Sequence, residues 1–134
     1  MIDYVLTEQG EAATGGPLIT PERVAAALEA GWLSFANEDD LQHAIELALL
    51  AKDLPAEREV ILHDQDGTPV GRIDLVCGRV GIEVKIAGRA PNVLRQLRRY
   101  ATAVEVDHLM LVTTCANHRQ IVLTGLTIIP IGRL

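Results

Sequence analysis

The sequence has no hydrophobic run long enough to cross a membrane, although 49% of its 134 residues are apolar. No basic segment followed by an apolar one opens the chain, so a signal peptide is not expected. The only two cysteines, Cys77 and Cys115, lie in apolar strand-like stretches, which predicts reduced core thiols rather than a disulfide. These absences predict a soluble, cytoplasmic protein with no membrane partner, long enough for one domain with its own core.

Zinc-like spacing of cysteine and histidine is also missing. The histidines are scattered, at His43, His63, His108 and His118, which predicts surface or partly buried side chains and not metal ligands. No internal repeat or long linker divides the chain.

Acidic residues are absent from residues 84–104, although the whole chain has a net charge of −6. This stretch contains five of the 12 basic residues, which leaves 7 basic and 18 acidic residues elsewhere, a net charge of −11. The five are Lys85, Arg89, Arg95, Arg98 and Arg99. The pattern is typical either of a groove for a phosphate backbone or of a solvated helix face.

Residues 73–86 predict a tight β-hairpin that turns at Gly78 and Arg79, because a two-residue loop with Gly first suits a type II′ turn. Closing the hairpin there pairs Cys77 with Val80, Val76 with Gly81, Leu75 with Ile82 and Asp74 with Glu83. Strand alternation then places a wholly apolar set on one face: Ile73, Leu75, Cys77, Val80, Ile82, Val84 and Ile86.

Asp74, Glu83 and Lys85 would share the other face of this hairpin. Directly opposed carboxylates repel each other, so a hairpin built only for stability has no reason to keep them. A divalent cation between Asp74 and Glu83 would remove the repulsion, and the pair therefore predicts a metal site. The alternative is that both acids are solvated residues on an outer face.

Two helices are predicted before the hairpin. The first begins at Thr20-Pro21-Glu22 and ends near Gly31, after residues 1–7 that form a short strand or an ordered arm, and Trp32 and Phe35 then anchor this piece to the body. The second runs from Asn37 or Glu38 to Lys52, with a core stripe of Leu41, Ala44, Ile45, Ala48 and Leu49.

Glu38 continues the core stripe of the second helix, whereas Glu46 lies on the opposite face. Glu38 is therefore the acid expected to point at the protein body, either as a site residue or as a first-turn acid that interacts with the helix dipole.

A third helix is predicted from Asn92 to Val104, with Val93, Leu97, Ala101 and Val104 as its apolar stripe. Gln96 and Tyr100 lie four residues apart at the edge of this stripe, where they form a buried hydrogen-bonded pair or contact the metal site or a phosphate. Further strands are predicted at Glu59–His63, at Leu109–Thr113 and, once or twice, within 121–131.

With this order of elements, residues 38–114 resemble the PD-(D/E)XK nuclease superfamily. Asp74 and the run Glu83-Val84-Lys85 match the Asp and the E-x-K of its second and third strands, and Ile73 stands where the name-giving Pro would be. The segment Gln96-Leu97-Arg98-Arg99-Tyr100 is similar to the Q-x-x-x-Y motif of the RecB and λ-exonuclease branches. Glu38-Asp39-Asp40-Leu41-Gln42 is similar to the helix opening of the VRR-NUC branch.

The resemblance implies an α/β fold with a restriction-endonuclease-like core, a mixed β-sheet flanked by helices in the order αβββαβ. This core would span residues 37–134, with residues 1–36 as an arm and short helix packed on it. The implied activity is a Mg²⁺- or Mn²⁺-dependent nuclease that hydrolyses phosphodiester bonds, in DNA rather than RNA, in a repair, recombination, restriction or phage setting.

The resemblance and the residue types together assign the site. The metal ligands would be Asp74, Glu83, Glu38 and the backbone carbonyl of Val84. Lys85 and Gln96 would complete the catalytic set. The residues expected to bind nucleic acid are Arg89, Arg95, Arg99 and Tyr100.

Two other classes of function stay open. In the first, the chain is a non-cleaving nucleic-acid-binding module of the same fold, and in the second it is an assembly subunit. In the second case, the N-terminal arm and residues 121–131 would form a homodimer or dock a helicase-type partner.

Overall fold

The computed structural model describes residues 18–30 and 33–132, and over these residues the chain is an α/β protein with a five-stranded mixed sheet and three α-helices. The elements, in chain order, are α1 (Pro21–Ala30), α2 (Glu38–Leu50), β1 (Glu57–His63), β2 (Pro69–Cys77), β3 (Val80–Lys85), α3 (Ala90–Tyr100), β4 (His108–Thr113), the 3₁₀ helix η1 (Ala116–Gln120) and β5 (Leu126–Pro130). None of the described helices is long and apolar enough to span a bilayer.

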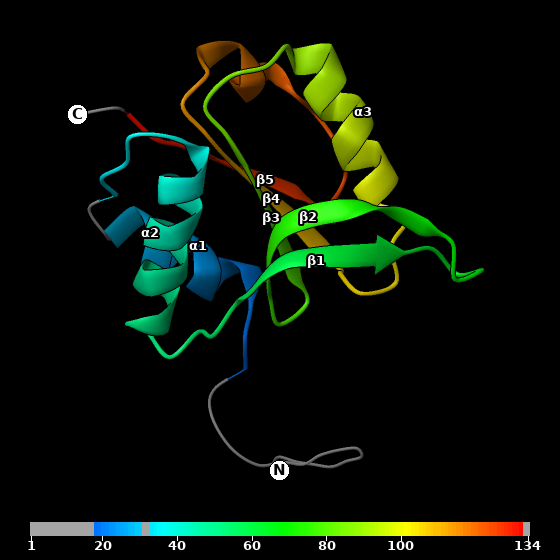
Figure 1. The fold of residues 1–134 in the computed structure, drawn as a ribbon, viewed down its shortest axis with the longest axis horizontal. Helices are drawn as coiled ribbons and strands as arrows, with labels where there is room; N and C mark the ends of the chain where they lie inside the picture. The colour runs from blue at the N-terminus through cyan, green and yellow to red at the C-terminus, as the bar shows by residue number, and fades with distance from the viewer. Residues whose placement is uncertain (1–17, 31–32, 133–134) are drawn as a thin grey trace.

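The strands lie in the order β1-β2-β3-β4-β5, so each strand neighbours the next in the chain (Figure 1). The pairs β1–β2 and β2–β3 are antiparallel, and β3–β4 and β4–β5 are parallel. A parallel pair needs a crossover connection, which α3 supplies between β3 and β4.

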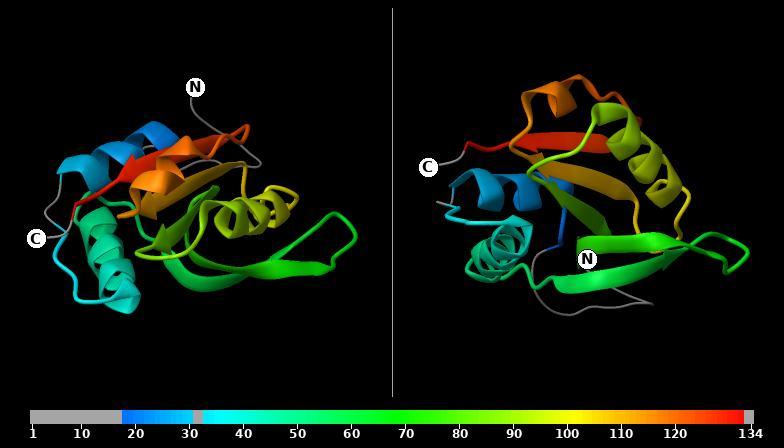
Figure 2. Two further views of the ribbon diagram at one scale, coloured as in Figure 1. Left: turned by 90° about the horizontal axis from the view of Figure 1, so that it is seen from above. Right: turned by 45° about the horizontal axis from the view of Figure 1, so that its top comes forward.

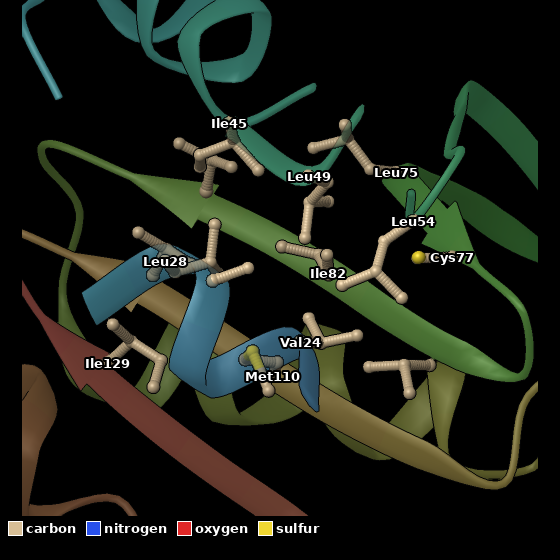
Figure 3. Packing of buried hydrophobic residues seen from close by; sticks show 14 of the residues in the cluster. Val24, Leu28, Ile45, Leu49, Leu54, Leu75, Cys77, Ile82, Met110 and Ile129 are labelled. Carbon is tan, nitrogen blue, oxygen red and sulfur yellow. The ribbon is translucent and has the colours of Figure 1, made fainter. Parts of the chain in front are cut away.

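Helices cover both faces of the sheet (Figure 2), with α1 and α2 on one face and α3 with η1 on the other. Figure 3 shows the first core, in which Val24 and Leu28 of α1 and Leu49 of α2 pack on Ile82 and Met110 of the sheet. The second core lies between α3 and the sheet. With both faces covered, residues on either side of β3 are buried.

Local signals for the first two helices are confirmed. The Thr20 hydroxyl accepts a hydrogen bond from the backbone N–H of Arg23, and the Asn37 side chain accepts one from Asp40. Helix α2 ends at Leu50, before the expected Lys52. The predicted arm at residues 1–7 and the anchor Trp32 lie outside the described residues, whereas Phe35 packs against the first core.

The predicted hairpin register is confirmed for three pairs, Cys77–Val80, Val76–Gly81 and Leu75–Ile82. The turn has Gly78 at φ +61° and no positive φ at the next residue, as a type II′ turn requires. The ladder ends at Leu75, so the expected direct pairing of Asp74 with Glu83 is not formed. The Asp74 side chain instead accepts a hydrogen bond from the Val84 backbone, at the point where the pairing of β2 with β3 ends.

Ile73 does not share the face of Leu75, contrary to the prediction. It belongs to the core under α3, and its Cδ1 would lie 2.8 Å from a Cβ added to Gly81. The alternation of β2 breaks because Asp74 is paired to neither neighbour: across from it on β1, Glu59 has φ +55° and leaves a gap in the ladder.

Helix α3 ends at Tyr100, so the predicted extension to Val104 is wrong. Ala101 and Val104 are exposed, and Ala103 and Val106 are buried in their place. The helix stops because the Thr102 hydroxyl bonds to the Arg99 carbonyl and the Val104 N–H bonds to the His63 carbonyl of β1.

The remaining predictions for the C-terminal half are largely confirmed. Strand β4 begins one residue before the predicted Leu109, and residues 121–131 contain one strand, β5. Cys77 and Cys115 are free thiols; Cys77 is buried and Cys115 only partly buried.

Replacing Ile82 with Ala should lower the free energy of unfolding by about 2–5 kcal/mol, because its side chain is fully buried between the sheet and the first two helices. Ile61 is a matched control, since it lies on β1 with 53% of its surface exposed. Ile61→Ala should cost about 1 kcal/mol or less. Urea unfolding measures both values, and equal losses would contradict this placement of the core.

Candidate metal and nucleic-acid site

Asp74 lies where β2 separates from β3. Its Oδ2 accepts a hydrogen bond of 2.8 Å from the backbone N–H of Val84. The N–H and C=O of one strand residue point to the same edge, so the Val84 carbonyl faces the same gap. Burial raises the pKa of Asp74 above its ordinary value, and the Val84 N–H and the charge of Lys85 act against this rise.

Glu83 places its carboxyl group in the interior, with 3% of its surface exposed. Its Oε1 is buried without a hydrogen-bond partner in the described protein, and its Oε2 lies 3.3 Å from Lys85 Nζ. Burial, and then the charge of Asp74, raise the pKa of Glu83 to about 8, although Lys85 lowers it. The charge of Asp74 therefore disfavours ionisation of Glu83, whereas a hydrogen bond with Glu83 lowers the pKa of Asp74.

Lys85 shares the side of β3 on which Glu83 lies, as strand alternation predicts. Its side chain is 21% exposed, so the ammonium group reaches the edge of the site. The backbone of Lys85 is fixed by β4, because its carbonyl accepts a hydrogen bond from the Thr114 N–H. The carboxylate and the ammonium are thus held beside each other by the sheet.

Glu38, the first residue of α2, points at the protein body as predicted. Its Oε2 accepts a hydrogen bond of 3.1 Å from the backbone N–H of Ile86, just after β3. Its charge also acts on Asp74, whose pKa it helps to raise. Glu46 instead lies 3.8 Å from His43, away from the site. The structure therefore brings Glu38 to the same region as the hairpin acids.

Gln96 and Tyr100 form the hydrogen-bonded pair that the sequence left open as one alternative, with Tyr100 buried and Gln96 partly exposed. The Gln96 amide donates to the Tyr100 hydroxyl at 2.9 Å, and this hydroxyl donates to the Arg72 carbonyl at 2.8 Å. Burial, and then the charge of Glu83, raise the pKa of Tyr100 to about 12. Because Tyr100 is 1% exposed, the structure does not support its assignment to nucleic-acid binding.

The arginines of the acid-free stretch are all on the surface. Arg89, Arg95, Arg98 and Arg99 are exposed, and no carboxylate of the described residues forms an ion pair with them. Arg95 donates a hydrogen bond to the Asn92 side chain. Arg89 directly precedes α3 and the other three lie on it. Together these four side chains form the arginine surface of α3, whose positive charge no ion pair of the described residues neutralises.

The described residues contain no group of three His, Cys, Asp or Glu side chains arranged to hold a metal ion. Two of the predicted ligands bond to backbone instead, Asp74 through Oδ2 and Glu38 through Oε2, and each keeps a second carboxylate oxygen. The orphaned Oε1 of Glu83 is the feature that fits a cation, since carboxylate and carbonyl oxygens are the donors that hard divalent ions prefer.

The sequence did not identify the residues that hold the loop between β3 and α3. His118 is fully buried, which corrects its prediction as a surface or partly buried side chain. Its Nε2 bonds to the Gly88 carbonyl and its Nδ1 to the Thr113 hydroxyl, both at 2.7 Å. A carbonyl can only accept, so Nε2 carries the hydrogen. This contact fixes the chain just before Arg89.

A scan against protein-family models, a search of curated proteins and a search of solved structures each found no match to this chain. Its function is therefore inferred from its residues and their geometry.

Glu83→Gln should stabilise the protein in a chelating buffer, and more so at higher pH. In the folded state the pKa of Glu83 is about 8, against an ordinary value of 4.5. The free energy of unfolding of the wild type therefore falls by about 1 kcal/mol per pH unit between these two pKa values, because unfolding releases the proton. The glutamine does not ionise, so its advantage should grow across this range in denaturant unfolding.

Glu46→Gln is the matched control, because Glu46 lies on the outer side of α2 next to His43. Its stability should follow the wild type at every pH. A constant difference between wild type and Glu83→Gln from pH 5 to pH 8 would contradict the burial of a repelled carboxylate at position 83.

Proposed function

We propose that this chain is a divalent-cation-dependent nuclease that hydrolyses phosphodiester bonds in DNA, on a restriction-endonuclease-like core. The observation that carries the proposal is Glu83, a buried carboxylate with an unpartnered oxygen beside a second acid, Asp74. Ionising both members of this pair costs stability in the absence of a ligand. A cation between the two acids offsets their repulsion and gives the orphaned oxygen a partner.

The order of the elements supports the restriction-endonuclease-like core. From α2 to β4 the chain has a helix, three antiparallel strands, a crossover helix and a parallel strand, which is the αβββαβ order with a mixed sheet. Helix α1 adds to the core on the α2 face, and β5 extends the sheet beyond β4. The candidate acids lie where β2 separates from β3, beside the first residue of α2.

Asp74, Glu83 and the Val84 carbonyl would hold the cation, with the second carboxylate oxygen of Glu38 as a further ligand. These oxygen donors suit Mg²⁺ or Mn²⁺. When bound, such a cation supplies positive charge to the scissile phosphate and makes water more acidic.

The remaining residues would act directly on the substrate. Lys85, held beside Glu83 with its ammonium partly exposed, would neutralise charge on the phosphate and orient the attacking water. Gln96 is partly exposed and keeps its side-chain carbonyl as an acceptor, so it would help to position the water or the strand. The arginine surface of α3 would hold the phosphate backbone on either side of the scissile bond.

The test is cleavage of a panel of linear, single-stranded, flapped and branched DNA with Mg²⁺ or Mn²⁺. Wild type should cut at least one of these, and Asp74→Asn should lose activity by about 100-fold or more, as when a group that stabilises transition-state charge is removed. Asp66→Asn is the matched control, because Asp66 is exposed in the β1–β2 turn, and it should retain full activity.

Activity that survives in Asp74→Asn would contradict the assigned site. DNA binding by the wild type, without cleavage of any form under either metal, would instead favour the non-cleaving binding module of the same fold.

Changing Arg95 and Arg99 together to Ala should weaken DNA binding for all sequences. If both contact phosphates, the slope of log affinity against log salt should become shallower by up to about two units. The saturated complex should still cut, since neither residue is assigned to the chemistry. The control is Lys52→Ala with Arg119→Ala, two exposed basic residues outside α3. Fluorescence anisotropy over a salt series measures the slopes, and unchanged values in the Arg95/Arg99 variant would make this surface a solvated face.

A further inference from the structure

On one of its two edges, strand β2 changes its neighbour at Asp74, from α3 before this residue to β3 after it. From Leu75 to Cys77 it is bonded to β3, whereas from Gly71 to Ile73 it is bonded to β1 on one side only. On its other side, this earlier segment lies against α3, which crosses close to β2 (Figure 1). Asp74 is therefore the point at which β2 leaves the β3 ladder.

Tyr100 contacts the segment before Asp74 in two ways. Its hydroxyl donates a hydrogen bond of 2.8 Å to the Arg72 carbonyl. The Gln96 amide donates to the Tyr100 hydroxyl oxygen, so the hydroxyl hydrogen is directed at Arg72. Its ring lies on Gly71, where an added Cβ would be only 2.6 Å from ring atom Cε1. Gly71 also has φ +146°, which residues with a side chain rarely adopt.

Two acceptors on β2 can serve the Val84 N–H. If the ladder continued past Leu75–Ile82, the next bonded pair would be Ile73 with Val84, and the Ile73 carbonyl would accept this hydrogen. In the structure the Asp74 carboxylate accepts it. Just before Ile73, Tyr100 bonds to the Arg72 carbonyl, and the Ile73 side chain is buried in the same core as Tyr100.

We propose that Gly71 and Tyr100 are positioning residues for Asp74: together they hold β2 away from β3, so that Asp74, and not the Ile73 carbonyl, bonds to the Val84 N–H. The consequence for cleavage rests on the proposed function. The positioning of Asp74 does not rest on the proposed function, because it concerns only hydrogen bonds within the chain. Neither residue needs to touch the substrate to have this effect.

The test uses NMR of the full chain in a chelating buffer. It measures how far Asp74→Asn shifts the Val84 amide resonance in different sequence backgrounds. In the wild-type background, Asp74→Asn should shift the Val84 amide resonance, because the substitution replaces a charged acceptor by a neutral one. In a Tyr100→Phe background the same change should have a much smaller effect, since Asp74 has already been released. Leu97→Val is the control background, because Leu97 is buried in the same core but has no bond to β2. It should keep the full wild-type shift.

Gly71→Ala provides a second background that should reproduce the effect of Tyr100→Phe, because the added Cβ displaces the ring. If Gly71→Ala does not fold, Tyr100→Phe alone decides. An Asp74→Asn shift of wild-type size in the Tyr100→Phe background overturns the proposal. So does an equal reduction in the Leu97→Val background, because general loosening of the core would then explain the result.

Calorimetry with Mn²⁺ links the positioning to the site. Tyr100→Phe should bind Mn²⁺ about tenfold more weakly, or worse, as is usual when a group that orients a metal ligand is lost. Leu97→Val should keep the wild-type affinity. If the wild type neither binds Mn²⁺ nor cuts DNA, the proposed function fails while the Val84 comparison still decides the positioning. If the wild type binds Mn²⁺ and Tyr100→Phe binds it equally well, the positioning is overturned while the proposed function stands.

Discussion

The hydrogen bond from the Val84 N–H to the Asp74 carboxylate is the interaction on which the candidate site depends. It takes the place of a backbone bond that would otherwise continue the β2–β3 ladder. A regular ladder would send the Asp74 side chain away from the plane of the sheet and leave no gap between the strands. Because the bond is made by the side chain, β2 can bend at this residue. The Val84 carbonyl and the buried Glu83 carboxylate then lie at the opening, with Glu38 at its end.

This arrangement is unfavourable by itself and is supported by the rest of the fold. Glu83 is removed from water next to another acid, and its pKa of about 8 expresses the cost of ionising it there. A small sheet with one wet face would relieve this by letting water in. Here both faces are covered by apolar cores, so β3 is buried from solvent along nearly its whole length. The stability gained from those cores allows the chain to keep a strained electrostatic site.

The sequence predicted what depends on neighbours in the chain. The Gly78 turn, three cross-strand pairs, the Asn37 cap and the direction of Glu38 all follow from patterns within a few residues. The errors lie where distant segments meet. Ile73 changes face and Tyr100 is buried because β2 packs on α3, and α3 stops early because the chain turns to bond with His63 of β1. His118 is buried through a carbonyl thirty residues away. No local pattern carries such contacts.

The charge pattern couples the two halves of the proposed site. In the proposed function, a phosphate held by the arginine surface of α3 would next meet Asp74, Glu83 and Glu38, whose ionised forms would repel it, and Lys85, which also faces Glu83, would offset only part of this repulsion. A cation among the carboxylates would make the opening attractive to phosphate. In the proposed function, affinity for the cation and affinity for nucleic acid would then raise each other, since binding free energies are reciprocally linked. The net charge of −6 is therefore compatible with a nucleic-acid substrate, because what matters is the charge at the opening and not the charge of the whole chain.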